Sequence, residues 1–189
     1  MNTVAQSLPS LLALTRDDSC VSHHSQVEAM LGRGVRFIQF RSKLLGGASL
    51  LEETRLAVDL ARQAGAVLIV NDSPEAAAHS GAHGVHLGVK DASLASACQS
   101  LGENAIIGRT VHTAEEARQV KSEGRCGYVG LGPVRSSKTK PGLRAVLEYR
   151  DFAEIKAILD PIPIYLIGGL GLADFDLIDD LGVAGLAVC

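Results

Sequence analysis

The sequence has no tryptophan, and the aromatic residues together make up only 4% of its 189 residues. This scarcity argues against the stacking platforms that bind single-stranded nucleic acid. An excess of positive charge is also missing, because 18 Lys and Arg face 21 Asp and Glu, for a formal net charge of −3. Nucleic acid is therefore not expected as a partner, and any site for a polyanion must come from a local cluster of cations.

Paired cysteines and long apolar runs are missing as well. The four cysteines lie far apart and form no C-x-x-C pair, which excludes the usual zinc sites and small disulfide scaffolds. An apolar stretch around residues 64–70 is much shorter than the roughly 20 residues of a membrane helix. The N-terminus has no Lys or Arg ahead of its apolar part, so it makes a poor signal peptide. We expect a cytoplasmic protein that does not enter a membrane.

What the sequence does have is a regular alternation of two patterns. Short apolar, β-branched runs recur at residues 11–15, 35–40, 67–71, 84–87, 105–108, 127–131, 162–167 and 184–188. Such runs are typical of parallel strands that are covered on both faces. Helical spacing of apolar residues separates most of them, at residues 25–32, 50–65, 92–101, 113–124, 149–159 and 173–182. The alternation predicts one α/β domain over residues 1–189, a compact (β/α)8 TIM barrel with the last helix missing or truncated.

In such folds the functional groups gather at the carboxyl ends of the strands. The second predicted strand ends in Gln39-Phe40-Arg41-Ser42-Lys43. Because successive strand residues point to opposite faces, Gln39, Arg41 and Lys43 share one face. The two cations either hold an anion between them or belong to a solvated strand end that pairs with nearby carboxylates. The residues alone favour neither interpretation.

Carboxylates follow the next two predicted strands. Asn71-Asp72 ends the third strand, and Asp91 comes shortly after the fourth. Each aspartate could simply cap the following helix. Together, and opposite a pair of cations, they are also what a magnesium–diphosphate site needs, since Mg2+ takes oxygen ligands and phosphates. The combination favours the metal site.

Two later segments suggest phosphate binding. Residues 132–142 alternate hydroxyls with cations between Gly and Pro, which is either a set of phosphate donors or a basic surface loop. Gly168-Gly169 follow the seventh predicted strand, where backbone amides can approach a phosphate at a helix end.

The histidines differ in their expected roles. His112 follows the fifth strand and is the only histidine placed for proton transfer. We expect His86, within the fourth strand, to be a packed core residue, and His23 and His24 to be exposed.

These motifs, in this order and over nearly the whole chain, resemble the thiamine phosphate synthase superfamily, which includes the thiazole tautomerases. The matching elements are Gln39-x-Arg41-x-Lys43, Asn71-Asp72, the GVHLG run at 84–88 with Asp91, Thr110-x-His112 with Thr in place of Ser, the loop at 132–140 and the IGG turn at 167–169. In that loop, Ser137, Thr139 and Lys140 stand on the family's ligand positions.

The resemblance implies a transferase that joins hydroxymethylpyrimidine diphosphate to thiazole phosphate and releases diphosphate. It implies that Asp72 and Asp91 hold Mg2+, and that Arg41, Lys43, Lys140 and His112 are catalytic. The residues that it implies for substrate binding are Gln39, Asn71, Thr110, Ser137, Thr139, Gly168 and Gly169.

Two alternatives stay open beside the transferase. One is a thiazole tautomerase in which His112 moves a proton without magnesium. The other is a non-catalytic barrel that binds a phosphate ligand. In each case the expected partner is a small phosphorylated molecule, and the sequence leaves open whether the protein is a monomer or a homo-oligomer.

Overall fold

A computed structural model describes residues 8–135 and 146–189 of the chain. Its strands form a closed parallel barrel in chain order, in which β1 pairs with both β2 and β8. The strands are β1 (Leu11–Leu14), β2 (Phe37–Phe40), β3 (Val67–Asn71), β4 (Gly84–Leu87), β5 (Ile106–Val111), β6 (Tyr128–Leu131), β7 (Ile164–Ile167) and β8 (Gly185–Val188). The predicted (β/α)8 barrel is confirmed.

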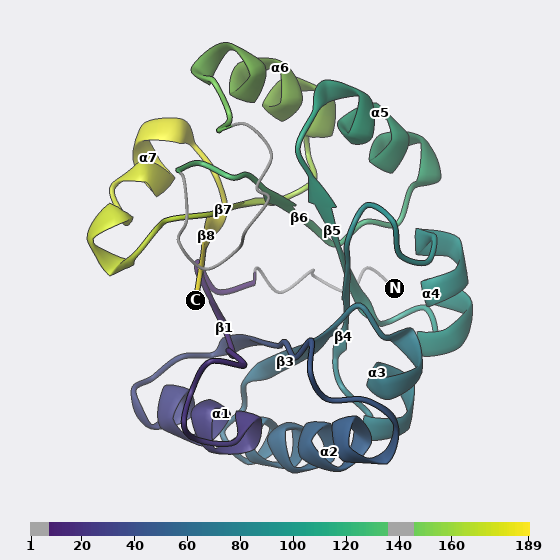
Figure 1. Ribbon diagram of the computed structural model, residues 1–189. Coiled ribbons are helices and arrows are strands. Elements are labelled where there is room, and N and C mark those ends of the chain that lie inside the picture. Colours follow the sequence, from purple (N-terminus) through teal and green to yellow (C-terminus); the bar gives the residue numbers. More distant parts are fainter. Residues whose placement is uncertain (1–7, 136–145) are drawn as a thin grey trace.

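Helices connect these strands and form a ring around the barrel (Figure 1). They are α1 (His23–Gly32), α2 (Gly47–Gln63), α3 (Pro74–Ser80), α4 (Leu94–Leu101), α5 (Ala114–Glu123), α6 (Tyr149–Leu159) and α7 (Leu177–Leu181), with a 3₁₀ turn, η1 (Leu172–Asp174), before α7. β8 is the last element of this chain. None of the helices in the described parts is long and apolar enough to cross a membrane.

Two connections differ from the sequence-based expectation. Helix α3 was not predicted, because seven residues are too few to show a helical period. Its ends were nevertheless readable: the Ser73 side chain accepts a hydrogen bond from the amide of Ala76, and Gly81 ends the helix with a left-handed φ of 69°. The continuous helix predicted at 173–182 is wrong, since η1 and the short helix α7 take its place.

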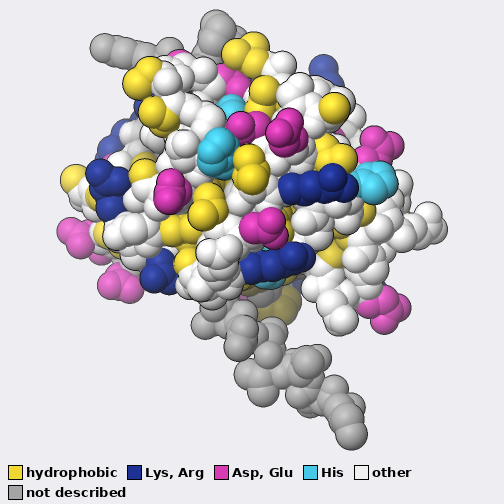
Figure 2. Space-filling model, turned by 90° about the horizontal axis from the view of Figure 1, so that it is seen from below, with side chains coloured by type: hydrophobic (Ala, Val, Ile, Leu, Met, Phe, Trp, Pro, Cys, Tyr) yellow, Lys and Arg dark blue, Asp and Glu magenta, His cyan; other side chains and the backbone are white. Residues whose placement is uncertain are grey.

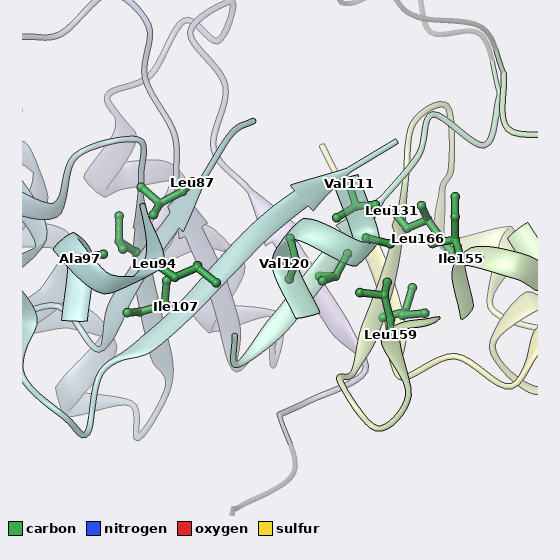
Figure 3. Close-up of a cluster of buried hydrophobic side chains, with 14 of the residues drawn as sticks. Leu87, Leu94, Ala97, Ile107, Val111, Val120, Leu131, Ile155, Leu159 and Leu166 are labelled. Atoms are coloured by element: carbon green, nitrogen blue, oxygen red, sulfur yellow. The ribbon is translucent and has the colours of Figure 1, made fainter. Parts of the chain in front are cut away.

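The apolar core has two layers. The outer layer lies between the strands and the helices; in it, for example, Leu87 and Ile107 of the barrel pack with Leu94 of α4 (Figure 3). The inner layer fills the barrel itself, where the rings of Phe37, Tyr128 and Tyr165 lie edge to face at centroid distances of 5.4–5.6 Å. The Tyr165 hydroxyl donates to the Pro9 carbonyl, 2.8 Å away and just before β1. The aromatic layer therefore lies toward the amino end of the barrel and leaves space at the carboxyl end.

Charged side chains of both signs are interspersed on the molecular face that Figure 2 shows. This mixture agrees with the near-balanced composition of 18 basic and 21 acidic residues. Charged side chains also gather inside the molecule's cavity, which opens at the carboxyl ends of the strands.

Candidate active site

A cavity of about 760 Å³ opens at the carboxyl ends of the strands. Parallel strands bring the residues that follow them to the same end of a barrel, whatever their separation in sequence. The cavity accordingly collects most of the predicted site residues: Gln39, Arg41, Lys43, Asn71, Asp72, Asp91, Thr110, His112, Gly168 and Gly169. The remaining three, Ser137, Thr139 and Lys140, lie outside the described residues.

The acidic pair lies on one side of this cavity. The Asp72 and Asp91 side chains lie close enough for the carboxyl of Asp72 to act on that of Asp91. Burial, together with this contact, raises the pKa of Asp91 above its ordinary value, although a hydrogen bond from the Gly88 amide to Asp91 Oδ2 (2.6 Å) acts in the opposite direction. The two groups form a concentrated site of negative charge.

The alternative role of these aspartates as helix caps is not what the structure shows. Ser73 is the N-cap of α3 and Ser93 is the N-cap of α4, and each serine side chain accepts a backbone amide hydrogen. Asp72 instead has a left-handed φ of 64°, and its amide donates to the carbonyl of His86 at 2.8 Å. This conformation suits an aspartate better than most residues, and it leaves the carboxylate on the cavity side of the turn.

The cations predicted from β2 lie beside the acidic pair. Lys43 Nζ forms an ion pair with Asp72 Oδ2, and both side chains are partly exposed. Arg41 lines the same cavity. Carboxylates and cations at one mouth create a place where a doubly charged metal and a polyanion can be bound together.

The donor set fits Mg2+ in particular. Among the described residues, no three His, Cys, Asp or Glu side chains are grouped so as to hold a metal ion. A site with only two protein carboxylates suits Mg2+, because this ion keeps several waters and commonly completes its octahedron with substrate phosphate oxygens.

A buried polar chain forms the floor of the cavity. His86 Nδ1 lies 2.7 Å from the Tyr128 hydroxyl, and His86 Nε2 lies 2.9 Å from Thr110 Oγ1. Burial raises the pKa of Tyr128 well above its ordinary value, while a hydrogen bond with the buried Gln39 side chain partly offsets this. His86 is thus the packed residue that the sequence predicted, but it also lines the cavity and orients Thr110.

His112 stands at the rim with a defined ring orientation. Its Nδ1 hydrogen bonds to the carbonyl of Gly132, and its amide donates to Glu116 Oε2 at 2.7 Å. A carbonyl oxygen can only accept, so Nδ1 is the donor in this network and Nε2 of the neutral ring is the acceptor. This tautomer has a lone pair available on Nε2 for a proton or for a substrate hydroxyl.

The glycine turn after β7 is required by its geometry. Gly168 has a φ of 104° and Gly169 a φ of 65°, and a Cβ on Gly168 would lie 2.7 Å from Pro133 Cβ. The element that follows is the three-residue turn η1, so the expected helix end beside a phosphate is absent here. The backbone amides of the turn itself are therefore the groups that this segment offers to a phosphate.

Sequence reasoning missed the segment after β1. Arg16, Asp17 and Asp18 line the cavity with the predicted residues. The signal is nevertheless present in the sequence, because Asp17 follows the apolar run at 11–15 just as Asp72 follows the run at 67–71. The expectation that His23 is exposed is wrong: it is 7% exposed and lies between Thr15 and Asp17.

Comparisons with known proteins point to one family. The family model described as thiamine monophosphate synthase matches residues 11–189. The chain is 38% identical over 170 residues to the thiamine-phosphate synthase of Anaeromyxobacter dehalogenans, which covers 87% of this chain and 72% of that protein. It is 35% identical to the one of Thermosynechococcus vestitus, over 86% of this chain but only 45% of that longer protein.

A solved structure shows the same likeness. The thiamine phosphate pyrophosphorylase from Pyrococcus furiosus superimposes with a TM-score of 0.80 at 26% identity, covering 97% of this chain and 87% of that chain.

Proposed function

The chain belongs to the thiamine monophosphate synthase family, and on that basis we propose that it is a transferase of thiamine biosynthesis. It would join hydroxymethylpyrimidine diphosphate to thiazole phosphate and release diphosphate. One observation carries the proposal: Arg41, Lys43 and the facing pair of Asp72 and Asp91 line a single cavity at the carboxyl end of the barrel.

The chemical demand of this reaction is to stabilise negative charge that grows on the leaving diphosphate. Arg41 and Lys43 would donate to its oxygens, and groups that are already oriented do so without reorganisation during the reaction. Lys140, outside the described residues, would be a third cation in this role. The Lys43–Asp72 ion pair would give way to a Lys43–diphosphate contact as the substrate binds.

Asp72 and Asp91 would hold Mg2+. When bound, this ion supplies positive charge to the diphosphate oxygens. Both carboxyls line the cavity, and both must be ionised to hold the ion, which the positive charge of the ion itself favours.

The remaining residues would bind and orient the two organic groups. Gln39 and Asn71 would orient the pyrimidine, with Thr110 beside them on the polar floor. The Gly168-Gly169 turn, with Ser137 and Thr139, would bind the thiazole phosphate. His112, with an acceptor at Nε2, would assist proton movement at the rim. We propose that residues 1–189 do this as one domain in the cytoplasm, which the four free cysteines support.

The test is to incubate the purified protein with both substrates and Mg2+ and to follow thiamine phosphate by mass spectrometry. We expect product from the wild type and none from Asp91→Ala or after chelation. Asp59→Ala is the control, because Asp59 lies on α2 in an exposed ion pair with Arg62. Aromatisation of a thiazole carboxylate phosphate without Mg2+ would instead assign the tautomerase activity. Binding of a phosphorylated ligand without any turnover would instead identify the protein as a non-catalytic barrel.

A further inference from the structure

Beside the segment that carries Arg41 and Lys43 lies a network of buried and partly buried polar groups that the proposed reaction does not use directly. It consists of Thr15 at the end of β1, Asp17 in the following loop and His23 at the start of α1. Thr15 is fully buried and His23 is 7% exposed. Burying a polar group lowers the stability of the fold unless the group is hydrogen bonded. The hydrogen bonds that these three side chains form therefore indicate what they do.

Thr15 fixes the backbone of Arg41 from both sides. Its hydroxyl accepts from the Arg41 amide at 2.8 Å and donates to the Arg41 carbonyl at 3.0 Å. The side chain therefore replaces a partner strand at the point where β2 has ended. Arg41 leaves the barrel with a defined backbone orientation because of this one hydroxyl.

Asp17 does the same for the next two residues. One carboxylate oxygen accepts from the Ser42 hydroxyl, and the other accepts from the Lys43 amide at 2.8 Å. Burial acts to raise the pKa of Asp17, but the hydrogen bonds from Ser42, Lys43 and His23 outweigh it and hold the pKa below its ordinary value. These donors thus favour the ionised carboxylate of Asp17.

His23 joins the two anchors. Its Nδ1 lies 2.9 Å from Thr15 Oγ1 and its Nε2 lies 3.1 Å from Asp17 Oδ1. The ring also packs against Phe40, the last residue of β2, at a centroid distance of 5.1 Å. The imidazole consequently links the helix α1 to the strand end that carries the two cations.

We propose that Thr15, Asp17 and His23 are positioning residues that hold the backbone from Arg41 to Lys43, so that both cations face the diphosphate of the substrate. The inference rests on the proposed function. Asp17 also lines the cavity, but its carboxylate oxygens are engaged by Ser42, Lys43 and His23, so all three residues act through Arg41 and Lys43 and not on the substrate. Donors that must meet an anion in a fixed arrangement lose much of their effect when their backbone is free to move.

The test uses substitutions that keep size and remove a contact. Thr15→Val removes the hydroxyl and Thr15→Ser restores it, while Asp17→Asn removes one of the two carboxylate acceptors. The matched control is Glu53→Gln, because Glu53 on α2 also accepts from a histidine, His24 Nδ1 at 3.0 Å, and from that residue's amide at 3.1 Å. That pair does not line the cavity.

Two measurements are made on folded protein: binding of inorganic diphosphate with Mg2+ by calorimetry, and the steady-state constants for each substrate. We expect Thr15→Val and Asp17→Asn to weaken diphosphate binding by roughly 10- to 100-fold. The KM for the pyrimidine diphosphate should rise with it, while the KM for thiazole phosphate stays unchanged. Thr15→Ser and Glu53→Gln should behave as the wild type. A purely structural role would alter both KM values together.

The possible failures are distinct. If the wild type binds diphosphate but Asp17→Asn binds it equally well, the positioning role is overturned, even when Thr15→Val cannot be purified. The positioning role is also overturned if Thr15→Ser loses as much diphosphate binding as Thr15→Val does. If the wild type neither binds diphosphate nor forms product, the proposed function itself fails and the positioning role with it.

Discussion

The Asp72 and Asp91 side chains, which follow the neighbouring strands β3 and β4, lie close together and line the same cavity at the mouth of the barrel. Two carboxyls in contact are unfavourable when both are ionised, unless a cation compensates them. Lys43 is paired with Asp72 and compensates part of this charge.

Asp91→Asn should lower kcat/KM by about 100-fold or more, because the diphosphate would lose part of its charge stabilisation. Raising the Mg2+ concentration should recover part of the loss, since the variant keeps Asp72 as a ligand. The measurement is a magnesium titration of initial rates. A variant with wild-type rates at every magnesium concentration would contradict the role of Asp91 as a ligand.

The floor of the cavity allows a comparison between two buried tyrosines. Tyr128→Phe removes a hydroxyl that lies 2.7 Å from His86 Nδ1 and hydrogen bonds with Gln39. Tyr165→Phe removes one that donates to the Pro9 carbonyl, at the other end of the barrel. Both should lose about 1–3 kcal/mol of unfolding free energy, because each substitution removes a hydrogen bond made by a buried hydroxyl.

Their effects on function should differ. Only Tyr128→Phe should raise the KM for the pyrimidine substrate, since Gln39 would lose a contact that orients it. Chemical denaturation and steady-state kinetics on both variants make the comparison. An equal rise in KM for Tyr165→Phe would show that general loosening of the barrel is responsible.

Gly108 provides a test of packing inside the barrel. A Cβ at this position would lie 2.2 Å from Tyr128 Cζ, so the Tyr128 ring already fills the space that the methyl group of an alanine would need. Gly108→Ala should therefore destabilise the fold by about 1–3 kcal/mol or more, as overpacked cores do. Gly32→Ala is the control, because nothing lies within 4 Å of its Cβ position and it ends helix α1. Denaturant melts of the two variants should separate them clearly; similar stabilities would show that Tyr128 can move.

The cysteines should differ in reactivity in the order of their exposure. Burial raises the pKa of Cys126 to about 12, whereas Cys20 is exposed. Because the thiolate is the reactive form, iodoacetamide at pH 8 should modify Cys20 quickly and leave Cys126 unmodified until the protein unfolds. Peptide mass spectrometry reads both sites, and early labelling of Cys126 would contradict the burial described here.

The sequence by itself determined the barrel and the main part of the cavity. Short apolar runs at regular intervals specify parallel strands, and the carboxyl ends of parallel strands must meet, so Arg41, Lys43, Asp72 and Asp91 could be placed together before any coordinates. It did not specify which polar residue at a strand end caps a helix, since aspartate and serine both can; the structure gives that role to Ser73 and Ser93.

Only the tertiary structure decided how the strand ends are held. The contacts of Thr15 with Arg41 and of Asp17 with Lys43 join residues that lie 26 positions apart in the chain. Such contacts depend on the register between β1 and β2 and on the turn that follows each strand, and these are set by packing over the whole barrel. Local patterns carry no record of that register, so the burial of His23 between the two contacts was not visible in the sequence.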